Sequence, residues 1–540
     1  MGTPGPTARP LDGVSLAPGL AEGRAVIYRD IFYRTTVYDI NIEGIEREWQ
    51  RLEHAIEETR SSIDAVATRI ETEMDEQMAA VFSAHAAILD DPSLRRDLRT
   101  CMEQRLINAE QVVRLVFHSW DQRLRRSGAL SGTEDLRDLV RRLLRSLHGI
   151  TAHGLENLAE NSVVVAQRLL PSDTLFLSRR AVAMVLEQGG WASHAAMLTR
   201  SRGIPAVGGI HGATTRISTG DHLAVDGSSG LVLHNPDSEA LKHFRRTTTR
   251  ESERLTLAWS RRHEPACTRS GREVAVWANA SAHGEVEAAL EGGAQAIGLF
   301  RVENLFLARD NLPDERELVR ELEFHLSPFS SRMLILRLLD VGADKIPSGM
   351  ALPSGTEGPL GLRGVRTLLR YRDLLDTQLN AALELHGRFS GLHLMLPMVT
   401  FPWEVDAVRE RLEQLATHTG RDTIPPLGAM IETPAAALAA DDLAAVSDFL
   451  SIGTNDLTQY TMAASRDALE LRDYYSSLHP AVLTLIGRVI EAAGDRPVSV
   501  CGEMARDQTA LDRLLDLGLR SISVSPPAIP LVKARIRQHD

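Results

Sequence analysis

Apolar residues near the start of the chain recur at the spacing of one helix face. From residue 42 onward they follow one another at steps of three, four and seven, which is typical of a long amphipathic helix. The helical pattern continues to about residue 147, with breaks near Asp91-Pro92 and Ser127-Gly128, and predicts a bundle of about four helices over residues 41–150. The first helix face consists of Ile45, Trp49, Leu52, Ile56, Ile63, Val66 and Ile70.

On both sides of this helical stretch the apolar residues form short runs typical of strands. Residues 13–29 contain two such runs around a Pro-Gly turn, and residues 161–234 contain several more, separated by glycine-rich turns. One short helix, SHAAMLTRS, is expected among the later runs. The bundle is therefore predicted to be an insertion in one α/β domain, which is formed by residues 10–40 and 151–236.

The C-terminal half contains eight apolar runs that mostly alternate with helical patterns. In order they are VAVWANAS, AIGLFRVE, LILRLLD, HLMLPMV, LGAMIETP, FLSIGTND, PVSVCGE and SISVSP. Parallel strands that are covered on both faces read as near-continuous apolar runs. Eight of them alternating with helices predict a (β/α)8 barrel over residues 264–540. Residues 237–263 are polar, rich in Arg and free of Gly and Pro, and predict a linking helix.

Composition narrows the class of protein. The chain is 43% hydrophobic and 24% charged, and no apolar run approaches the ~20 residues of a membrane helix, so no membrane insertion is expected. The N-terminus lacks the basic and apolar segments of a signal peptide. A net charge of -12 argues against nucleic acid as a partner. The three cysteines are odd in number and far apart, which argues against a disulfide framework and predicts a cytoplasmic location.

The carboxyl ends of the predicted barrel strands, where the active sites of such barrels lie, carry a distinctive set of side chains. Guanidinium groups suit phosphate and carboxylate, because each can donate two hydrogen bonds to either group. Acids from neighbouring strands suit Mg2+, which prefers a few carboxylates together with substrate oxygens. With a thiol added, the set predicts a site for a small phosphorylated carboxylic acid bound with Mg2+. Its members are Asn279, Arg301, Arg337 with Asp340, Met398, Glu432, Asn455 with Asp456, and Cys501 with Glu503.

Each of these residues also has an ordinary structural role open to it. A single Arg at a strand end is commonly structural, and Glu432 or Asp456 could cap the helix that follows it. Cys501 could be a small buried hydrophobic residue. The prediction of a site therefore depends on the coincidence of all of them on one rim, and scatter over unrelated surfaces would favour the structural roles.

A second set of residues lies in the segment EQGGWASHAAMLTRSRGIPAVGG. Gly189-Gly190 predicts a tight turn, Ser193 is a suitable helix N-cap, and His194 then falls in the first helical turn. The positive end of a helix disfavours imidazolium and stabilises an attached anion. Because attack on phosphorus requires a neutral nitrogen, His194 is the candidate nucleophile among the chain's 18 histidines.

These segments resemble a known family, Enzyme I of the bacterial phosphoenolpyruvate:sugar phosphotransferase system (PTS) and its relatives. GGWASHAAMLTR is similar to the phosphohistidine segment of that family. GLFRVENLFLARDNLP, LRLLDVGADK, GAMIETPAAA, FLSIGTNDLTQYTMAASRD and VCGEMARD are similar to its phosphoenolpyruvate-binding segments. The resemblance runs nearly end to end, with departures at Trp191, Ala343, Ser465 and the loop at residues 358–360.

The resemblance implies an α/β multidomain phosphotransferase. A swivelling phosphohistidine α/β domain with an inserted helical bundle would precede a (β/α)8 barrel that binds phosphoenolpyruvate and forms a homodimer. The bundle would dock the phosphocarrier protein HPr. Two half-reactions would follow, from phosphoenolpyruvate to the enzyme's own histidine and then to a histidine of HPr, the first step of PTS sugar uptake.

The resemblance also implies roles for individual residues. His194 would carry the phosphoryl group on Nε2, and Cys501 would protonate the enolate carbon as pyruvate forms. The implied ligand set is Arg301 and Arg337 for the phosphoryl group, Arg466, Asn455 and Asp456 for the rest of the substrate, and Glu432 and Asp456 for Mg2+.

Two other functions stay open at this point. An enzyme like pyruvate phosphate dikinase or phosphoenolpyruvate synthase joins similar domains to a large ATP-binding domain, whereas the region before residue 161 has no Gly-rich nucleotide loop. A non-catalytic regulator would bind phosphoenolpyruvate or HPr as a signal, but it would have no use for the Cys501 thiol. Labelling of His194 that required ATP would favour the dikinase or synthase, and a regulatory output that survived His194→Ala would favour the non-catalytic regulator.

Overall fold

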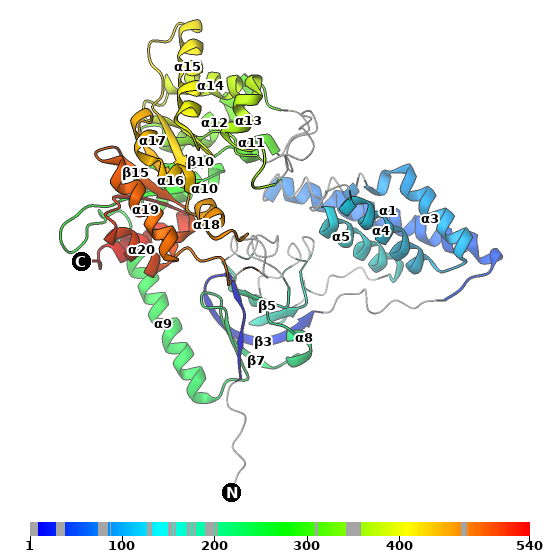
Figure 1. Cartoon of the computed structure of the whole chain (residues 1–540). Helices are drawn as coiled ribbons and strands as arrows, with labels where there is room; N and C mark the ends of the chain where they lie inside the picture. The colour runs from blue at the N-terminus through cyan, green and yellow to red at the C-terminus, as the bar shows by residue number, and fades with distance from the viewer. Residues whose placement is uncertain are drawn as a thin grey trace. The chain divides into compact units, whose positions relative to one another are not determined.

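The chain folds into two compact units, Met1–Arg250 and Glu251–Asp540. The division falls within helix α9 (Ser238–Ser260), where a linking helix is predicted (Figure 1). The computed structural model describes residues 9–28, 38–73, 85–86, 88–126, 132–149, 155, 158–169, 173, 177, 180–188, 199, 203–307, 312–341, 358–465, 471 and 473–540.

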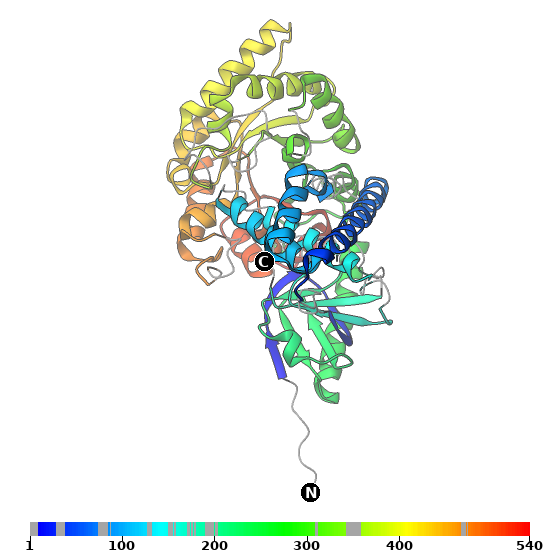
Figure 2. The same ribbon diagram turned by 90° about the vertical axis from the view of Figure 1, so that its right-hand side faces the viewer.

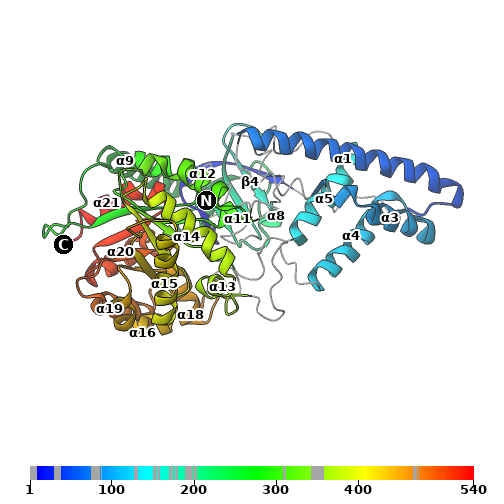
Figure 3. The same cartoon turned by 90° about the horizontal axis from the view of Figure 1, so that it is seen from above.

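The predicted helical bundle is confirmed in the first unit. Asp91 caps the second of its described helices by accepting a hydrogen bond from the Ser93 amide at 2.7 Å, where the sequence pattern predicts a break. The long first helix packs against the others through Leu52, Ile56 and Ile63, which are fully buried (Figure 3). The described elements are η2 (Ile42–Gly44), α1 (Ile45–Glu73), α3 (Pro92–Arg105), α4 (Ala109–Arg126) and α5 (Gly132–Leu147).

An eight-stranded sheet forms the rest of the first unit, in the order β1-β8-β7-β3-β4-β5-β6-β2. Neighbours from β3 to β6 are parallel, and the other pairs are antiparallel. Strands from the N-terminus thus share one sheet with strands from residues 206–234 (Figure 2). The strands are β1 (Arg9–Asp12), β2 (Val14–Ala17), β3 (Leu20–Tyr28), β4 (Ser162–Ala166), β5 (Ala181–Leu186), β6 (Ala206–Gly208), β7 (His222–Asp226) and β8 (Leu231–His234), and a short helix α8 (Ala213–Arg216) follows β6.

The helical bundle is inserted between two strands that pair directly with each other, β3 and β4. Alternate residues of β4 are buried in two different cores, Val163 and Val165 in one and Val164 and Ala166 in the other, so both faces of the sheet are covered. Arg141 of α5 joins the bundle to the sheet, because it pairs with Asp173, which also accepts a hydrogen bond from the Tyr28 hydroxyl at 2.7 Å.

The second unit is a closed barrel of eight parallel strands, as predicted. Each apolar run found in the sequence overlaps one of them. The strands are β9 (Ala275–Ala280), β10 (Ile297–Arg301), β11 (Leu334–Arg337), β12 (Leu392–Leu396), β13 (Leu427–Ile431), β14 (Leu450–Ile452), β15 (Val498–Cys501) and β16 (Ser521–Val524). The helices are α10 (His283–Glu291), α11 (Glu303–Leu307), α12 (Glu315–Leu326), α13 (Val365–Arg370), α14 (Arg372–His386), α15 (Pro402–His418), α16 (Pro434–Leu438), α17 (Ala440–Val446), α18 (Thr454–Met462), α19 (Pro480–Ala493), α20 (Gln508–Asp516) and α21 (Ile529–Ile536).

The barrel strands are apolar on both faces because each face packs against a different core. Leu334 and Leu336 of β11 belong to the core between strands and helices, whereas Ile335 belongs to a separate inner cluster. That inner cluster also contains Met395, Met430 and Cys501. Within the described residues, no helix is both long enough and apolar enough to cross a bilayer. The predicted domain boundaries themselves remain predictions.

Candidate active site at the carboxyl rim of the barrel

The residues predicted for the barrel site lie at one end of the strands. Arg301, Arg337 and Cys501 are the last residues of β10, β11 and β15. Glu432 follows β13 directly, and Asn455 and Asp456 lie in the first turn of α18, just after β14. Since all eight strands are parallel and closed into a barrel, these ends form one rim. His194 and Arg466, the other two predicted site residues, lie outside the described residues.

Arg337 is buried at this rim between carboxylates. Its Nη2 donates to Glu303 Oε1 at 2.7 Å, and its Nη1 lies 3.4 Å from Asp340 Oδ2. Burial lowers the pKa of the guanidinium, but Glu303, Asp340 and Glu432 outweigh it and hold the pKa above its ordinary value. Arg337 is therefore a permanent, well-positioned positive charge at the mouth of the barrel.

Arg363 is a further rim residue, and the sequence analysis missed it. It lies in the loop before α13 and donates two hydrogen bonds to Asp340, at 3.0 and 2.7 Å. Its Nη1 is also 3.6 Å from Asp456 Oδ1. Asp340 thus holds two guanidinium groups at once. The signal in the sequence is an arginine within the glycine-rich segment GPLGLRG, which by itself does not indicate which side chain that arginine contacts.

Glu432 is the least exposed acid of the predicted set, at 1%. Its Oε1 accepts a hydrogen bond from the Met398 amide at 2.6 Å. Burial raises the pKa of this carboxyl, the negative charges of Asp456 and Asp340 raise it further, and Arg337 lowers it, which leaves it at about 8. A buried carboxyl that repels its neighbours in this way would be stabilised by a cation.

The rim therefore offers a pair of acids, Glu432 and Asp456, rather than a complete protein cage. Among the residues that the structure describes, no group of three or more His, Cys, Asp or Glu side chains is arranged to hold a metal ion. Mg2+ usually keeps several waters and is held by one or two carboxylates together with substrate phosphate oxygens. The acid pair fits that mode of binding.

Cys501 is buried, with 6% of its surface exposed, at the end of β15. The Ser451 hydroxyl donates to its sulfur at 3.0 Å, and the thiol lies 3.7 Å from the Ile452 carbonyl oxygen. Burial raises the pKa of the thiol to about 11, even though the Ser451 hydrogen bond lowers it. The thiol therefore holds its proton at neutral pH, as an acid in a reaction must.

Several polar atoms at the rim are buried without a partner in the structure. They include Arg337 Nε and Asn279 Oδ1, although the Asn279 amide nitrogen donates to the Ser523 carbonyl oxygen at 3.3 Å. Asn455 Oδ1 accepts from the Glu503 amide at 3.2 Å. Buried polar groups are almost always hydrogen-bonded, so orphaned ones at the mouth of a barrel point to a polar ligand.

Three family profiles match the chain, and together they cover most of its length. Residues 257–540 match the PEP-binding domain of PEP-utilising enzymes, residues 158–230 match their mobile domain, and residues 12–130 match their N-terminal domain. The fold and the rim thus define a PEP-utilising enzyme, in which a mobile domain accompanies a barrel.

Similar proteins of known name indicate which PEP-utilising enzymes this chain belongs with. A phosphoenolpyruvate-protein phosphotransferase of Geobacillus stearothermophilus is 33% identical over 98% of this chain and 93% of its own length. One from Haloferax volcanii is 35% identical over 99% of this chain and 95% of its own length. The chain belongs to the phosphoenolpyruvate-protein phosphotransferases, the Enzyme I family.

Proposed function

We propose that this protein transfers the phosphoryl group of phosphoenolpyruvate to its own His194 and then to a histidine of the phosphocarrier HPr, as the first step of PTS sugar uptake. The observation that carries the proposal is the rim itself. Buried guanidinium groups, an acid pair and a protonated thiol meet at the mouth of a barrel that matches the PEP-binding domain. Neither alternative function has an observation in its favour.

In the first half-reaction, a neutral nitrogen of His194 attacks phosphorus, and the bond between phosphorus and the enol oxygen breaks. Arg301 and Arg337 hold the phosphoryl oxygens and stabilise the charge on the transferring group. Asn455 and Arg466 orient the rest of the substrate, including its carboxylate. Glu432 and Asp456 would hold Mg2+, which supplies further positive charge when bound; Asp456 also borders the substrate.

The leaving enolate then takes a proton on carbon. The Cys501 thiol would give this proton; its raised pKa, which keeps the thiol protonated, and its position on the same rim as Arg337 and Glu432 support this role. Proton transfer leaves a thiolate on Cys501 and releases pyruvate, and a proton from solvent restores the thiol.

The second half-reaction requires a second location for His194. The helical bundle would bind HPr, so the phosphohistidine domain would move between the barrel and the bundle. Residues 237–263, most of which form α9, would permit this movement. A cross-link that locks this segment should stop turnover and leave phosphoenolpyruvate binding intact, and unchanged turnover would contradict the hinge.

We also propose a cytoplasmic homodimer that associates through the barrel. All three cysteines are free thiols, which suits a reducing compartment. The barrel unit exposes large apolar side chains, among them Leu360 and the stacked rings of Phe401 and Trp403. Exposed apolar groups of this kind favour a protein interface. Light scattering at several concentrations would detect the dimer.

The decisive experiment is incubation with labelled phosphoenolpyruvate and Mg2+ in the absence of ATP. We expect label on His194 in the native chain, transfer of that label to purified HPr, and no label in His194→Ala. Label that requires ATP, or that persists in His194→Ala, would overturn the proposal. Label on His194 that no HPr accepts would refute the second step alone.

A further inference from the structure

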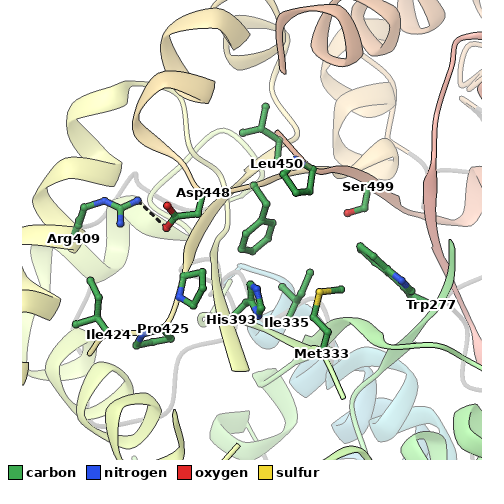
Figure 4. A pocket seen from close by; sticks show the side chains of 13 residues that line it. Trp277, Met333, Ile335, His393, Arg409, Ile424, Pro425, Asp448, Leu450 and Ser499 are labelled. Atoms are coloured by element: carbon green, nitrogen blue, oxygen red, sulfur yellow. Dashed lines mark hydrogen bonds and ion pairs between the residues drawn. The ribbon is translucent and has the colours of Figure 1, made fainter. Parts of the chain in front are cut away.

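Figure 4 shows the side chains around a cavity of about 510 Å³ in the barrel unit. Its walls include residues that come just before strands, such as Met333 before β11, Phe449 before β14 and Pro497 before β15. The active-site residues come at or after the other ends of these strands. The cavity is therefore a separate site, and its volume lies within the ~300–1,000 Å³ that is typical of small-molecule pockets.

The wall is mainly apolar and aromatic. The ring of His393 meets the ring of Phe449 edge to face, with centroids 5.7 Å apart, and Trp277 lies on another part of the wall. The Phe449 ring also packs on Gly428, where a Cβ would fall 2.4 Å from Phe449 Cζ, so a larger residue at 428 would displace it. Aromatic rings of this kind suit a flat aromatic ligand, because aromatic pairs favour offset stacking or edge-to-face contact.

The two charged residues of the wall, Arg409 and Asp448, pair with each other. Arg409 donates to Asp448 at 3.1 Å and to the Val446 carbonyl oxygen at 3.0 Å. Asp448 also accepts from the Leu427 amide at 2.7 Å. Because this ion pair adds no net charge to the wall, an uncharged ligand is favoured.

Two polar groups on the wall can orient such a ligand. His393 Nδ1 lies 2.9 Å from the Gly391 carbonyl oxygen, which can only accept, so Nδ1 is the donor in this contact; in the tautomer that carries its proton there, Nε2 is an acceptor. Ser499 supplies a hydroxyl. An N–H or O–H group on the ligand would find an acceptor in either.

Ser499 also connects the cavity with the catalytic rim through buried hydroxyl groups. Its hydroxyl donates to Ser451 Oγ at 3.1 Å, and Ser451 donates to Cys501 Sγ at 3.0 Å. A ligand that engages Ser499 would change the hydrogen bonding of Ser451 and hence of the thiol.

We infer that this cavity binds a small, uncharged aromatic molecule that carries one hydrogen-bond donor, and that its occupancy changes the reactivity of Cys501. The inference goes beyond the proposed function. Both parts are measured without phosphoenolpyruvate or HPr, so their failure would leave the phosphotransfer proposal untouched.

Binding is tested on the whole chain with indole as the probe. Saturation-transfer NMR detects bound indole, and a titration measures its affinity. Met333→Trp and Ile424→Trp fill the cavity from two positions, and Leu438→Trp, on an exposed part of α16, is the matched control. We expect the two cavity variants to weaken indole binding at least about tenfold and the control to bind as the native chain does. No binding to the native chain, or unchanged binding in a folded cavity variant, would overturn the site.

The connection to the thiol is tested by the rate at which iodoacetamide alkylates Cys501, with Cys101 and Cys267 replaced by serine. We expect indole to change this rate at least about twofold, and Ser499→Ala to abolish the change, because the hydroxyl that connects the cavity to Ser451 is lost. Bound indole that leaves the rate unchanged, or an equal effect in Ser499→Ala, would refute the connection.

Discussion

Asp340→Asn tests whether one buried carboxylate organises the guanidinium groups of the rim. The Asp340 side chain is 2% exposed, accepts two hydrogen bonds from Arg363, and lies 3.4 Å from Arg337. Asparagine keeps the shape but removes the charge and turns one acceptor into a donor. Arg363 would then lose its bidentate partner, and the buried positive charges would repel each other.

The expected size of the effect follows from these contacts. Breaking a buried ion pair by removing one partner costs about 3–5 kcal/mol. Arg337 keeps its 2.7 Å hydrogen bond to Glu303, and asparagine can still accept one hydrogen bond from Arg363, so we expect about 2–3 kcal/mol of lost stability. Displaced guanidinium groups should also lower kcat/KM about 10²-fold, because catalytic groups must be held in place.

Urea unfolding followed by circular dichroism measures the stability, and pyruvate release in a coupled assay measures kcat/KM. Asp376→Asn is the matched control, since Asp376 accepts two hydrogen bonds from Arg411 at 2.8 and 2.6 Å on the outer helices. That pair is partly exposed, so its loss should cost less than about 1 kcal/mol and leave catalysis unchanged. Equal effects of the two substitutions, or full activity in Asp340→Asn, would refute the reasoning.

Three further predictions follow from buried groups of the barrel. Cys501→Ser should lower pyruvate formation about 10²–10⁴-fold, the usual contribution of a general acid. Since burial raises the pKa of the Cys501 thiol to about 11, the proton-donating form persists as pH rises, and deprotonation of the thiol should not lower the native rate of pyruvate formation below about pH 10. A fall in rate at lower pH that disappears in Cys501→Ser would contradict this. Glu432→Gln should raise the half-saturating Mg2+ concentration at least about tenfold. In the native enzyme that concentration should fall as pH rises toward 8, because a carboxyl whose pKa is about 8 must lose its proton to bind metal. A half-saturating concentration that does not change with pH would argue against Glu432 as a ligand. Lys533→Met should destabilise the barrel by about 2–4 kcal/mol in urea unfolding. Lys533 is buried and donates to the carbonyl oxygens of Arg262 at 2.7 Å and Gly293 at 2.6 Å, and both oxygens would lose this partner. Unchanged stability would refute this prediction.

Much of the fold could be predicted from local patterns. The heptad-like spacing from Ile45 onward predicts α1, and each apolar run of the C-terminal half overlaps one barrel strand. The rim could be predicted as well, because parallel strands of a barrel place their carboxyl ends together. That rule brings Arg301, Arg337 and Cys501 to one end without knowledge of any contact.

The individual partners at the rim could not be predicted in the same way. Arg363 and Asp340 are 23 residues apart, and their pairing is a contact between two segments that no local pattern connects. Ser451 and Cys501 are 50 residues apart and meet because adjacent strands both turn these side chains inward. Nothing in either local sequence distinguishes such partners from other serines and arginines.

The sequence by itself predicted the helices and strands, the rim of the barrel on which the candidate site residues lie, and the family that the chain resembles. The period of apolar residues reports the geometry of a single helix or strand, and that geometry is local. Only the tertiary structure decided that Asp340 holds two arginines, that Glu432 has a raised pKa, and that a cavity lies at the other end of the barrel from the Cys501 thiol. These properties depend on distances between segments far apart in the chain, and the energies of charge and hydrogen bonding are set by those distances.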